Sequence, residues 1–281
     1  MSENNLSFEY CDNLVKEFEN VIDKTVVAKN SSYFTGVDLG TACIVLAVMD
    51  ENSKPVAGTY KYADVVRDGM VVDYIGAVKI VRELKEELEN KLNTELIYAA
   101  AAIPPGTDEL DSGAIKNVVQ AAGFELIKVV DEPTAANAVL KIENGAIVDI
   151  GGGTTGISIL KDGKVVYVAD EPTGGTHFSL VISGAYGMSF QEADLYKRDN
   201  KKHKELLPVL KPVIEKVSSI INKHIRDFEV KEISLVGGTC CLEGIEDIIE
   251  KETGIYTHKP KNPMFVTPLG IALNCIDEMK Q

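Results

Sequence analysis

The sequence predicts a two-lobed α/β fold in which each lobe is a copy of the same unit. A pattern of strand, turn and strand occurs twice, each copy places an aspartate next to a glycine-rich turn, and helical periodicity follows each copy. The chain has 281 residues, 45% of them hydrophobic, which is enough for the cores of two ordinary domains. We therefore expect a globular protein with an internal duplication rather than a disordered chain.

Residues 1–32 form a separate N-terminal segment. Apolar side chains between Cys11 and Ile22 recur at intervals of three, four and seven, with charged residues between them, which is typical of an amphipathic helix. The polar stretch KNSSY (29–33) then joins this helix to the rest of the chain. The apolar face packs either on the chain's own body, which is the interpretation we favour, or on a partner.

The repeated unit begins after this joint. In its first copy an apolar strand runs into GVDLGT (36–41), a second strand follows, and DENSKP (50–55) breaks the chain before a third strand. The second copy, AIVDIGGGTTGISILKDGKVVYVA (146–169), repeats the same order. Asp38 and Asp149 hold matching places in the two copies. We expect lobe I to comprise residues 33–144 and 266–281, and lobe II to comprise residues 145–265.

Helical periodicity marks the segments between these strands. From Tyr74 to Leu92 the apolar residues lie on one helical face, and Gly123 is a candidate C-cap for the shorter helix that follows. Residues 206–225 form a long amphipathic pattern, and residues 267–280 form a closing helix. We therefore expect sheets with helices packed on them in both lobes.

The two aspartate–glycine turns have two interpretations. Glycine-rich turns occur in tight β-hairpins, because glycine adopts backbone angles that other residues avoid. Alternatively, their bare N–H groups bind phosphate, and Asp38 and Asp149 lie near a Mg²⁺ ion that keeps several of its waters. The duplication favours the second interpretation, because two matched loops would hold the β- and γ-phosphates of one nucleotide in a cleft.

Two further segments fit a nucleotide site. LVGGTCCLEG (235–244) is a third glycine turn between a strand and a helix, where backbone would pack against the nucleoside. In VVDEPTAANAVL (129–140), Glu132 and Pro133 make a good helix start, which by itself explains these two residues. Because Glu132 also opens the connection to the second copy, it is a candidate for orienting the water that attacks a γ-phosphate.

Composition restricts the partners of the chain. With 43 acidic and 29 basic residues the formal net charge is −14, which argues against nucleic acids and anionic membranes as partners. The five cysteines lack Cys-x-x-Cys spacing, which favours reduced thiols in the cytoplasm over disulfides or a zinc site. The start MSENNLSFEY is polar, unlike a signal peptide, and no apolar run approaches the roughly 20 residues that cross a bilayer. A polyanionic ligand would therefore have to be held by loops and a metal ion.

The order of the motifs resembles that of the actin/DnaK-type ATPase superfamily. The segments that follow one another as the phosphate-1, connect-1, phosphate-2, adenosine and connect-2 motifs are GVDLGT, VDEPTAANAVL, VDIGGGTTGISIL, LVGGT and TPLGIAL. Within the superfamily, AYGMSFQEADLYKRD and GGTTGISILKDGKVVYVADEPTGG resemble the EutJ family of chaperone-like proteins of ethanolamine utilization. The resemblance covers nearly all of the chain after residue 32. It implies the actin-like ATPase fold, with two duplicated ribonuclease-H-like lobes around a nucleotide cleft.

The resemblance also implies an activity. It suggests ATP and Mg²⁺ as cofactors and a slow ATPase that releases ADP and phosphate. It further suggests a cytoplasmic chaperone-like protein associated with a bacterial microcompartment, whose enzymes or shell proteins would be the clients. Alternatives from other classes are a nucleotide-binding switch without turnover, a filament-forming actin-like protein, and a small-molecule kinase of the same superfamily.

The resemblance assigns roles to particular residues. Asp38, Glu132, Asp149 and Thr154 match catalytic positions, and the two aspartates also match the positions near the metal, which they would hold through water. Three charged residues of EADLYKR match those through which chaperone ATPases hold ribose and adenine. The positions expected to bind the nucleotide are Gly40, Thr41, Gly151, Gly152, Gly153, Asp194, Lys197, Arg198, Gly237, Gly238 and Thr239.

The chain departs from the family pattern at several positions. Cys241 stands where chaperones place an arginine over the adenine, and Gly156 replaces an acidic residue that follows the phosphate-2 threonine. Ala42 replaces a hydroxyl of the phosphate-1 loop, and Asp194 is shorter than the family's glutamate. Lys61 is near the place of the chaperones' catalytic lysine but does not align with it. Together these departures favour slow hydrolysis, or binding without turnover.

Overall fold

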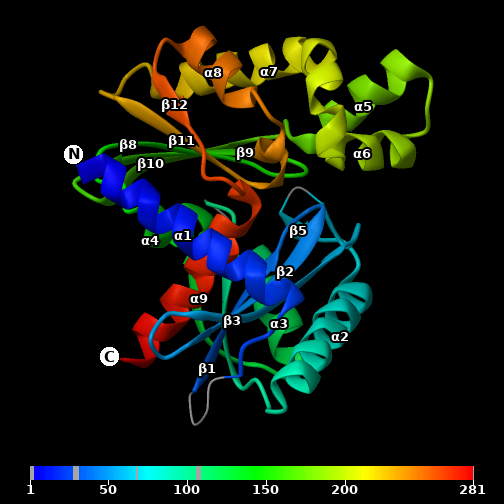
Figure 1. Cartoon of the computed structure of the whole chain (residues 1–281), viewed down its shortest axis with the longest axis vertical. Coiled ribbons are helices and arrows are strands. Elements are labelled where there is room, and N and C mark those ends of the chain that lie inside the picture. The colour runs from blue at the N-terminus through cyan, green and yellow to red at the C-terminus, as the bar shows by residue number, and fades with distance from the viewer. Residues whose placement is uncertain (1–2, 28–31, 68, 106–108, 281) are drawn as a thin grey trace. The chain divides into compact units, whose positions relative to one another are not determined.

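The computed structural model describes residues 3–27, 32–67, 69–105 and 109–280, and it divides into two compact units. Unit 1 comprises Met1–Lys141 and Pro260–Gln281, and unit 2 comprises Ile142–Lys259. Each unit has its own sheet (Figure 1). Each sheet has five strands, and each unit has its own buried core. Most of the joint expected at 29–33 lies outside the described residues.

The two sheets have the same topology. The strand order is β3-β2-β1-β6-β7 in unit 1 and β10-β9-β8-β11-β12 in unit 2. In each sheet the first three strands are antiparallel neighbours, and the last two run parallel to the strand that carries the aspartate. This strand-by-strand match confirms the predicted duplication and the actin-like ATPase fold.

The strands of unit 1 are β1 (Tyr33–Leu39), β2 (Cys43–Asp50), β3 (Pro55–Tyr62), β6 (Tyr98–Ile103) and β7 (Glu125–Asp131), beside a small ribbon of β4 (Val66–Arg67) and β5 (Met70–Val71). The strands of unit 2 are β8 (Gly145–Ile150), β9 (Thr155–Lys161), β10 (Lys164–Glu171), β11 (Glu232–Val236) and β12 (Tyr256–His258). Both central strands are buried along most of their length, as expected for sheets covered by helices.

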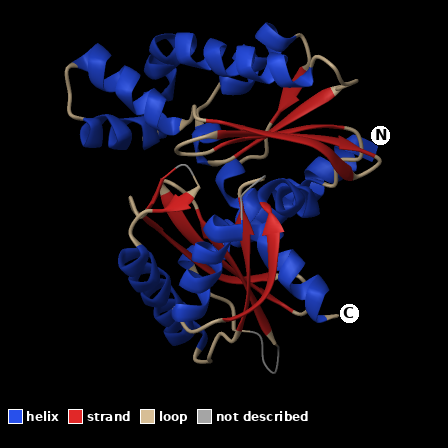
Figure 2. Ribbon diagram, turned by 180° about the vertical axis from the view of Figure 1, so that it is seen from behind, coloured by secondary structure: helices blue, strands red, loops and turns tan. Residues whose placement is uncertain are grey.

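Helices pack on both faces of the sheet of unit 1 (Figure 2). One face carries α2 (Tyr74–Leu92) and α3 (Glu109–Ala121), and the other carries α4 (Glu132–Leu140) and α9 (Val266–Met279). Asp73 caps α2 by accepting a hydrogen bond from the N–H of Gly76 at 2.9 Å. The predicted apolar face is confirmed from Val78 to Leu92, where its side chains are part of the buried core of the unit, whereas Tyr74 at the start of the helix is exposed.

The backbone of α9 lies directly on β1 and α4. A Cβ atom on Gly36 of β1 would lie 2.4 Å from the carbonyl O of Pro268. A Cβ atom on Gly270 of α9 would lie 1.8 Å from the carbonyl O of Ala135. Glycine at these two positions therefore allows α9 to come close to both neighbours.

The N-terminal helix α1 (Glu3–Asp23) packs on unit 1, in agreement with the interpretation we favoured. The ring of Phe18 is buried and lies 5.1 Å, centroid to centroid, from the ring of Phe265. A Cβ atom on Gly58 of β3 would lie 2.4 Å from the ring of Phe18. Asp12 accepts a hydrogen bond at 2.9 Å from the N–H of Lys261. The apolar face of α1 is thus buried within its own unit.

In unit 2, apolar side chains of β8 and β9 pack with those of the helices in one buried cluster. The helices of this unit are α5 (Gly175–Tyr186), α6 (Phe190–Arg198), α7 (His203–Ile225) and α8 (Ile245–Thr253), with 3₁₀ turns η1 (Asn200–Lys202) and η2 (Gly238–Cys241). A further turn, η3 (Pro263–Phe265), precedes α9 in unit 1.

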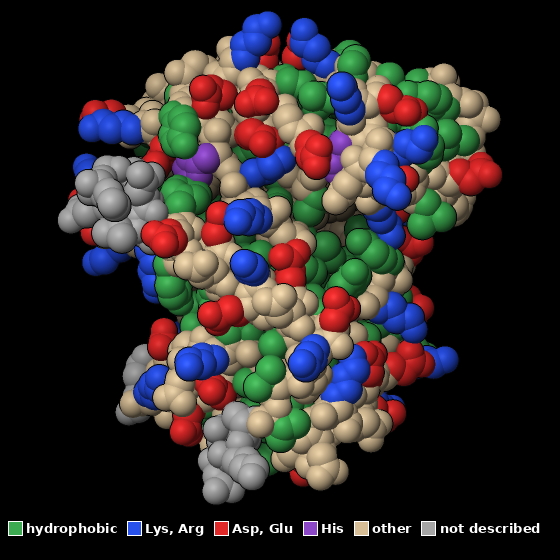
Figure 3. Space-filling model, in the orientation of Figure 1, with side chains coloured by type: hydrophobic (Ala, Val, Ile, Leu, Met, Phe, Trp, Pro, Cys, Tyr) green, Lys and Arg blue, Asp and Glu red, His purple; other side chains and the backbone are tan. Residues whose placement is uncertain are grey.

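Acidic and basic side chains are interspersed over the face of the molecule in Figure 3. Within the described ranges, no helix combines the length and apolar character needed to cross a membrane.

Candidate functional site

Asp149 lies at the end of β8, where it is surrounded by backbone of neighbouring strands. In the sheet it pairs with Val236 of β11 and with Gly156 of β9. Gly237 follows β11 with φ +90°, and a Cβ atom there would lie 2.2 Å from Oδ1 of Asp149. Only glycine fits this place, so the third glycine turn brings bare backbone against the carboxyl group of Asp149.

The loop that follows Asp149 is held by its carbonyl groups. The carbonyl O of Gly151 accepts hydrogen bonds from the N–H of Gly175 at 2.9 Å and from Oγ1 of Thr239 at 2.7 Å. Among the residues that the structure describes, none accepts a hydrogen bond from the N–H groups of Gly152 and Gly153. The loop therefore has fixed carbonyl groups and spare N–H donors, which is the chemistry of an anion-binding loop.

Gly174 and Gly175 also belong to this assembly, although sequence reasoning did not select them. A Cβ atom on Gly174 would lie 2.7 Å from the carbonyl carbon of Gly153, and one on Gly175 would lie 2.5 Å from Oγ1 of Thr239. Both glycines are buried; Gly174 is the N-cap of α5 and Gly175 is its first residue, and two residues separate them from the end of β10. The glycine doublet in PTGGT (172–176) was the only signal in the sequence for these two residues. Their contact with the phosphate-2 loop cannot be read from the sequence, because the fold brings the two segments together.

The charged residues of α6 form one cluster with the start of α5. Nζ of Lys197 donates to the carbonyl O of Gly175 at 2.8 Å, to Oγ of Ser179 at 2.7 Å and to Oδ1 of Asp194 at 2.8 Å. Arg198 donates to Oδ2 of the same aspartate. The structure thus brings the three predicted residues of EADLYKR together, and it adds the buried hydroxyl of Ser179 to them.

Burial and charge oppose each other at Asp194. Burial of its carboxyl group works to raise the pKa, but the positive charges of Lys197 and Arg198 outweigh burial and hold the pKa below its usual range. At Lys197 burial dominates and lowers the pKa of the ammonium group, although Asp194 works to raise it. Asp194 is therefore ionised at neutral pH.

We expect Asp194→Asn to destabilise unit 2 by about 2 kcal/mol at neutral pH, because Lys197 and Arg198 lose a charged acceptor. The folded pKa of Asp194 is depressed, so its contribution is present above the unfolded pKa of about 3.9 and is lost as pH falls through the folded pKa. Denaturant unfolding should thus show a constant difference from the parent between about pH 7 and pH 5, shrinking below about pH 4. Asp227→Asn removes an exposed carboxylate and should have little effect at any pH.

In unit 1, the predicted residues gather at one edge of the sheet. The strands β1, β6 and β7 are parallel, with Val37 level with Ala101 and Ile103 level with Asp131. Asp38 and Glu132 therefore both lie where these strands end. The loop with Gly40 and Thr41 continues from the same edge into β2.

Glu132 is the first residue of α4. The side chain of Asp131 caps this helix by accepting a hydrogen bond from the N–H of Thr134 at 2.9 Å, and Pro133 occupies the first turn. Two strong helix-start signals fix the position of Glu132 at the sheet edge, in partial contact with solvent.

The structure shows what surrounds three of the positions that depart from the superfamily pattern, Lys61, Gly156 and Cys241. Lys61 forms an ion pair with Glu83 of α2 at 2.9 Å. Gly156 is level with Asp170 of β10, and a Cβ atom on Gly156 would lie 3.9 Å from Oδ1 of Asp170. The strand β10 therefore supplies a carboxylate next to the position where the resemblance to chaperones and MreB-type proteins implies an acidic residue. Cys241 is half-buried. The neighbouring Cys240 is fully buried, and burial raises the pKa of the Cys240 thiol.

The donor groups fit Mg²⁺ bound largely through water. Within the described ranges, no three His, Cys, Asp or Glu side chains are grouped so that they could hold a metal ion directly. Mg²⁺ keeps several waters and is commonly bound by one or two carboxylates together with phosphate oxygens. Asp38 in unit 1 and Asp149 in unit 2 each supply one carboxylate next to a glycine turn, and a carboxylate is the kind of group that such coordination uses.

Comparisons with known proteins agree with this geometry. A family model described as MreB/Mbl protein matches residues 23–185, and a model described as type IV pilus assembly protein PilM matches residues 117–265. The chain is 44% identical over 251 residues to the ethanolamine utilization protein EutJ of Salmonella typhimurium strain LT2, covering 89% of this chain and 88% of the relative.

Solved structures give the same result. The crystal structure of ethanolamine utilization protein EutJ from Carboxydothermus hydrogenoformans is 46% identical, covers 95% of this chain and 98% of its own, and has a TM-score of 0.90. The crystal structure of MreB5 of Spiroplasma citri bound to ADP is 18% identical, covers 89% of this chain and 99% of its own, and has a TM-score of 0.70. The second similarity shows the fold alone.

Proposed function

Because the chain belongs to the EutJ family of ethanolamine utilization proteins, we propose that it binds ATP with Mg²⁺ through the loops that follow β1 and β8. The observation that carries this proposal is the loop after β8, where the carbonyl groups of Gly151 and Gly152 accept hydrogen bonds while the N–H groups of Gly152 and Gly153 have no acceptor among the described residues. Phosphate oxygens are acceptors without donors, so they match such a loop. Asp38, Gly40 and Thr41 would act in the same way in unit 1.

The nucleoside would bind to the remaining residues of unit 2. Asp194 is a half-buried carboxylate suited to accept hydrogen bonds from ribose hydroxyls, and Arg198 beside it has a planar guanidinium that can stack on adenine. The backbone of Gly237, Gly238 and Thr239 would lie against the adenosine, as the resemblance implies. Cys241 offers no stacking surface, so this part of the site should bind adenine less tightly than a chaperone does.

We further propose that ATP is hydrolysed slowly. Glu132 would orient the attacking water, and Thr154 would stay close to the transferred phosphoryl group. Mg²⁺, when bound, would neutralise charge that develops on the phosphate oxygens. Two observations support a low rate. Position 156 itself carries no carboxylate, so the nearest one comes from Asp170 of the neighbouring strand. Lys61 does not align with the chaperones' catalytic lysine, and its charge is paired with Glu83.

The cellular part of the proposal rests on family membership. We propose a cytoplasmic chaperone-like protein of ethanolamine utilization that acts on enzymes or shell proteins of a bacterial microcompartment. A nucleotide switch without turnover is the second candidate, and the departures at Gly156 and Cys241 favour it. The fold similarity to MreB keeps a filament-forming protein as a third candidate.

Titration calorimetry with ATP and Mg²⁺, together with phosphate release from the same samples, tests the proposal. We expect saturable binding by the parent and by Glu132→Gln, because Glu132 would act on the water rather than on the nucleotide. Phosphate release should fall about 100-fold in Glu132→Gln, a typical loss for a group that activates a nucleophile.

Each outcome of this titration decides between the candidates. Binding without phosphate release by the parent would identify a switch and overturn the ATPase proposal. ATP-dependent light scattering would identify a filament. Absence of binding at millimolar ATP would overturn the nucleotide proposal altogether.

A further inference from the structure

The contacts of Lys197 point to a role different from the one that the resemblance assigns to it. We propose that Lys197 is a positioning residue: it does not contact the nucleotide, but links Asp194 to the phosphate-2 loop and holds that loop in its binding conformation. This inference rests on the proposed ATP site and specifies how one of its residues works.

The ammonium group of Lys197 has no donor to spare. A lysine ammonium carries three N–H bonds. Its three acceptors are the carbonyl O of Gly175 at 2.8 Å, Oγ of Ser179 at 2.7 Å and Oδ1 of Asp194 at 2.8 Å. All three distances are those of strong charge-assisted bonds, and the side chain is only 15% exposed. A nucleotide atom could reach this group only by displacing one of these acceptors.

One of these bonds leads to the phosphate-2 loop. Lys197 binds the carbonyl O of Gly175, and the N–H of Gly175 donates to the carbonyl O of Gly151 at 2.9 Å. Oγ1 of Thr239 donates to the same carbonyl at 2.7 Å. Lys197 is therefore two hydrogen bonds away from the glycines that bind phosphate, and the adenosine turn joins at the same carbonyl.

Asp194 keeps capacity for a ligand at the other end of this network. Its Oδ1 accepts from Lys197 and from Ser179, whereas Arg198 donates to its Oδ2. A carboxylate has about four lone-pair sites, so Oδ2 can accept one more bond from a hydroxyl. The nucleoside would thus contact Asp194 on the side that Lys197 does not occupy.

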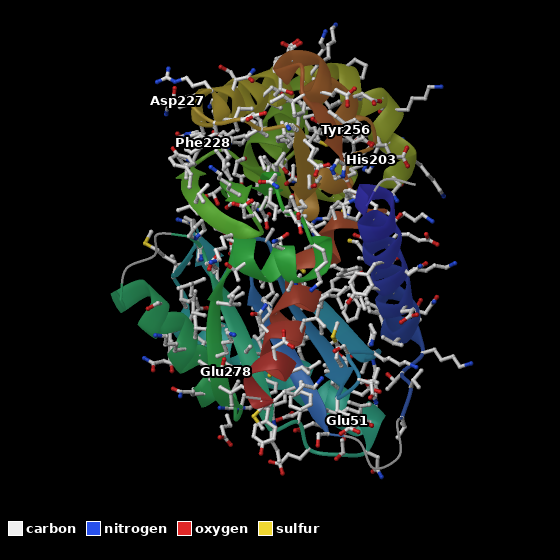
Figure 4. The ribbon with its side chains drawn as sticks, turned by 90° about the vertical axis from the view of Figure 1, so that its left-hand side faces the viewer. Glu51, His203, Asp227, Phe228, Tyr256 and Glu278 are labelled. Atoms are coloured by element: carbon white, nitrogen blue, oxygen red, sulfur yellow. The ribbon has the colours of Figure 1, made fainter. Side chains whose placement is uncertain are left out.

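The backbone of Lys197 is fixed as well as its side chain. Nε2 of His203 lies 3.0 Å from the carbonyl O of Lys197, and Nδ1 of His203 accepts from the N–H of Glu243 at 3.2 Å. Both contacts fit a neutral imidazole with its proton on Nε2. Figure 4 labels this buried histidine, which begins α7. A movement of the α6 backbone that carried Lys197 toward a nucleotide would therefore have to break the contact of α6 with His203 at the start of α7.

The test separates a positioning role from direct contact by using two ligands. Adenosine lacks phosphates, and inorganic tripolyphosphate with Mg²⁺ lacks ribose and base. Their affinities for the parent and for Lys197→Met are measured by competition against ATP, with Lys201→Met, which removes the same charge from an exposed site, as the control.

If Lys197 positions the loop, its replacement by methionine weakens tripolyphosphate binding by about tenfold, which is what one lost charge-assisted hydrogen bond typically costs. Lys201→Met should leave the affinity for tripolyphosphate unchanged within about twofold, because an exposed lysine contributes little to the conformation of the loop. If Lys197 contacts ribose or base directly, the same variant weakens adenosine binding and leaves tripolyphosphate binding unchanged. That second result would overturn the inference while leaving the ATP proposal intact.

Two more variants keep the test valid if Lys197→Met folds poorly. Ser179→Ala removes one acceptor of the network without changing charge, and it should weaken tripolyphosphate binding in the same direction. Lys197→Arg keeps the charge but replaces three tetrahedral donors with a planar fork, so it should not restore binding. Full rescue by arginine would show that only the charge matters, and it would overturn the inference. Failure of the parent to bind ATP would instead count against the proposed function.

Discussion

Replacement of Asp149 by alanine will lower the affinity for Mg²⁺ and ATP by at least about 100-fold, or roughly 3 kcal/mol. The backbone of Asp149 is held in register with Val236 and Gly156, and Gly237 lies close to its carboxyl group. Asp149 stands two residues before Gly151, the first glycine of the loop that is proposed to bind the phosphates. With 43 acidic and 29 basic residues, the net charge of the chain is −14, so its overall charge opposes rather than assists the binding of a triphosphate.

The effect on binding must be separated from an effect on folding. Gly237 packs against Oδ1 of Asp149, so alanine leaves a small void at that place. Asp149→Asn keeps the volume and removes only the charge. We expect both variants to unfold near the parent in a denaturant titration and both to lose Mg²⁺-dependent binding in calorimetry. Asp227→Ala, at an exposed position, should bind like the parent. Binding of ATP by Asp149→Asn with parental affinity would show that the phosphate-2 assignment is wrong.

Much of the fold was predictable, because the duplicated pattern is local in sequence. Each copy contains three consecutive strands joined by short turns, so the period of two and the turn residues appear in one stretch. The apolar face of the helix Tyr74–Leu92 was predicted, because its periodicity is a local feature. Its caps at Asp73 and Asn93 were found only in the structure. The order of strands in the finished sheets followed from the resemblance and not from periodicity.

The site was predictable only in part, because several of its contacts join distant segments. Asp38, Asp149 and the glycines after them have motif signals. Gly175 has no motif signal of comparable strength, because its role depends on a hydrogen bond to Gly151, which lies 24 residues earlier in the chain. Lys197 was selected as a ligand-binding residue because its position matched a motif. Its three acceptors come from two helices, and no local pattern shows that they occupy all of its donors.

The second large effect is expected on stability rather than on binding. Gly270→Ala will destabilise unit 1 by about 3 kcal/mol or more, because the added Cβ would lie 1.8 Å from the carbonyl O of Ala135 and 2.4 Å from its carbonyl carbon. Both atoms belong to the backbone of α4, so no side chain can rotate away. The helices α4 and α9 would have to move apart. Because α4 begins with Glu132, this movement should also displace the residue proposed to orient water, and phosphate release should fall with stability.

The chain offers a matched control in the same unit. Gly113 lies inside α3, and a Cβ atom there would meet nothing within 4 Å. Gly113→Ala should therefore stabilise the protein by about 0.5–1 kcal/mol, because alanine favours a helix over glycine by this amount. Denaturant unfolding of the two variants should show shifts of opposite sign, although the chemical change is identical. A Gly270→Ala protein as stable as the Gly113→Ala protein would mean that α4 and α9 are not in backbone contact. The close approach of these two helices would then no longer explain how Glu132 is held at the edge of the sheet.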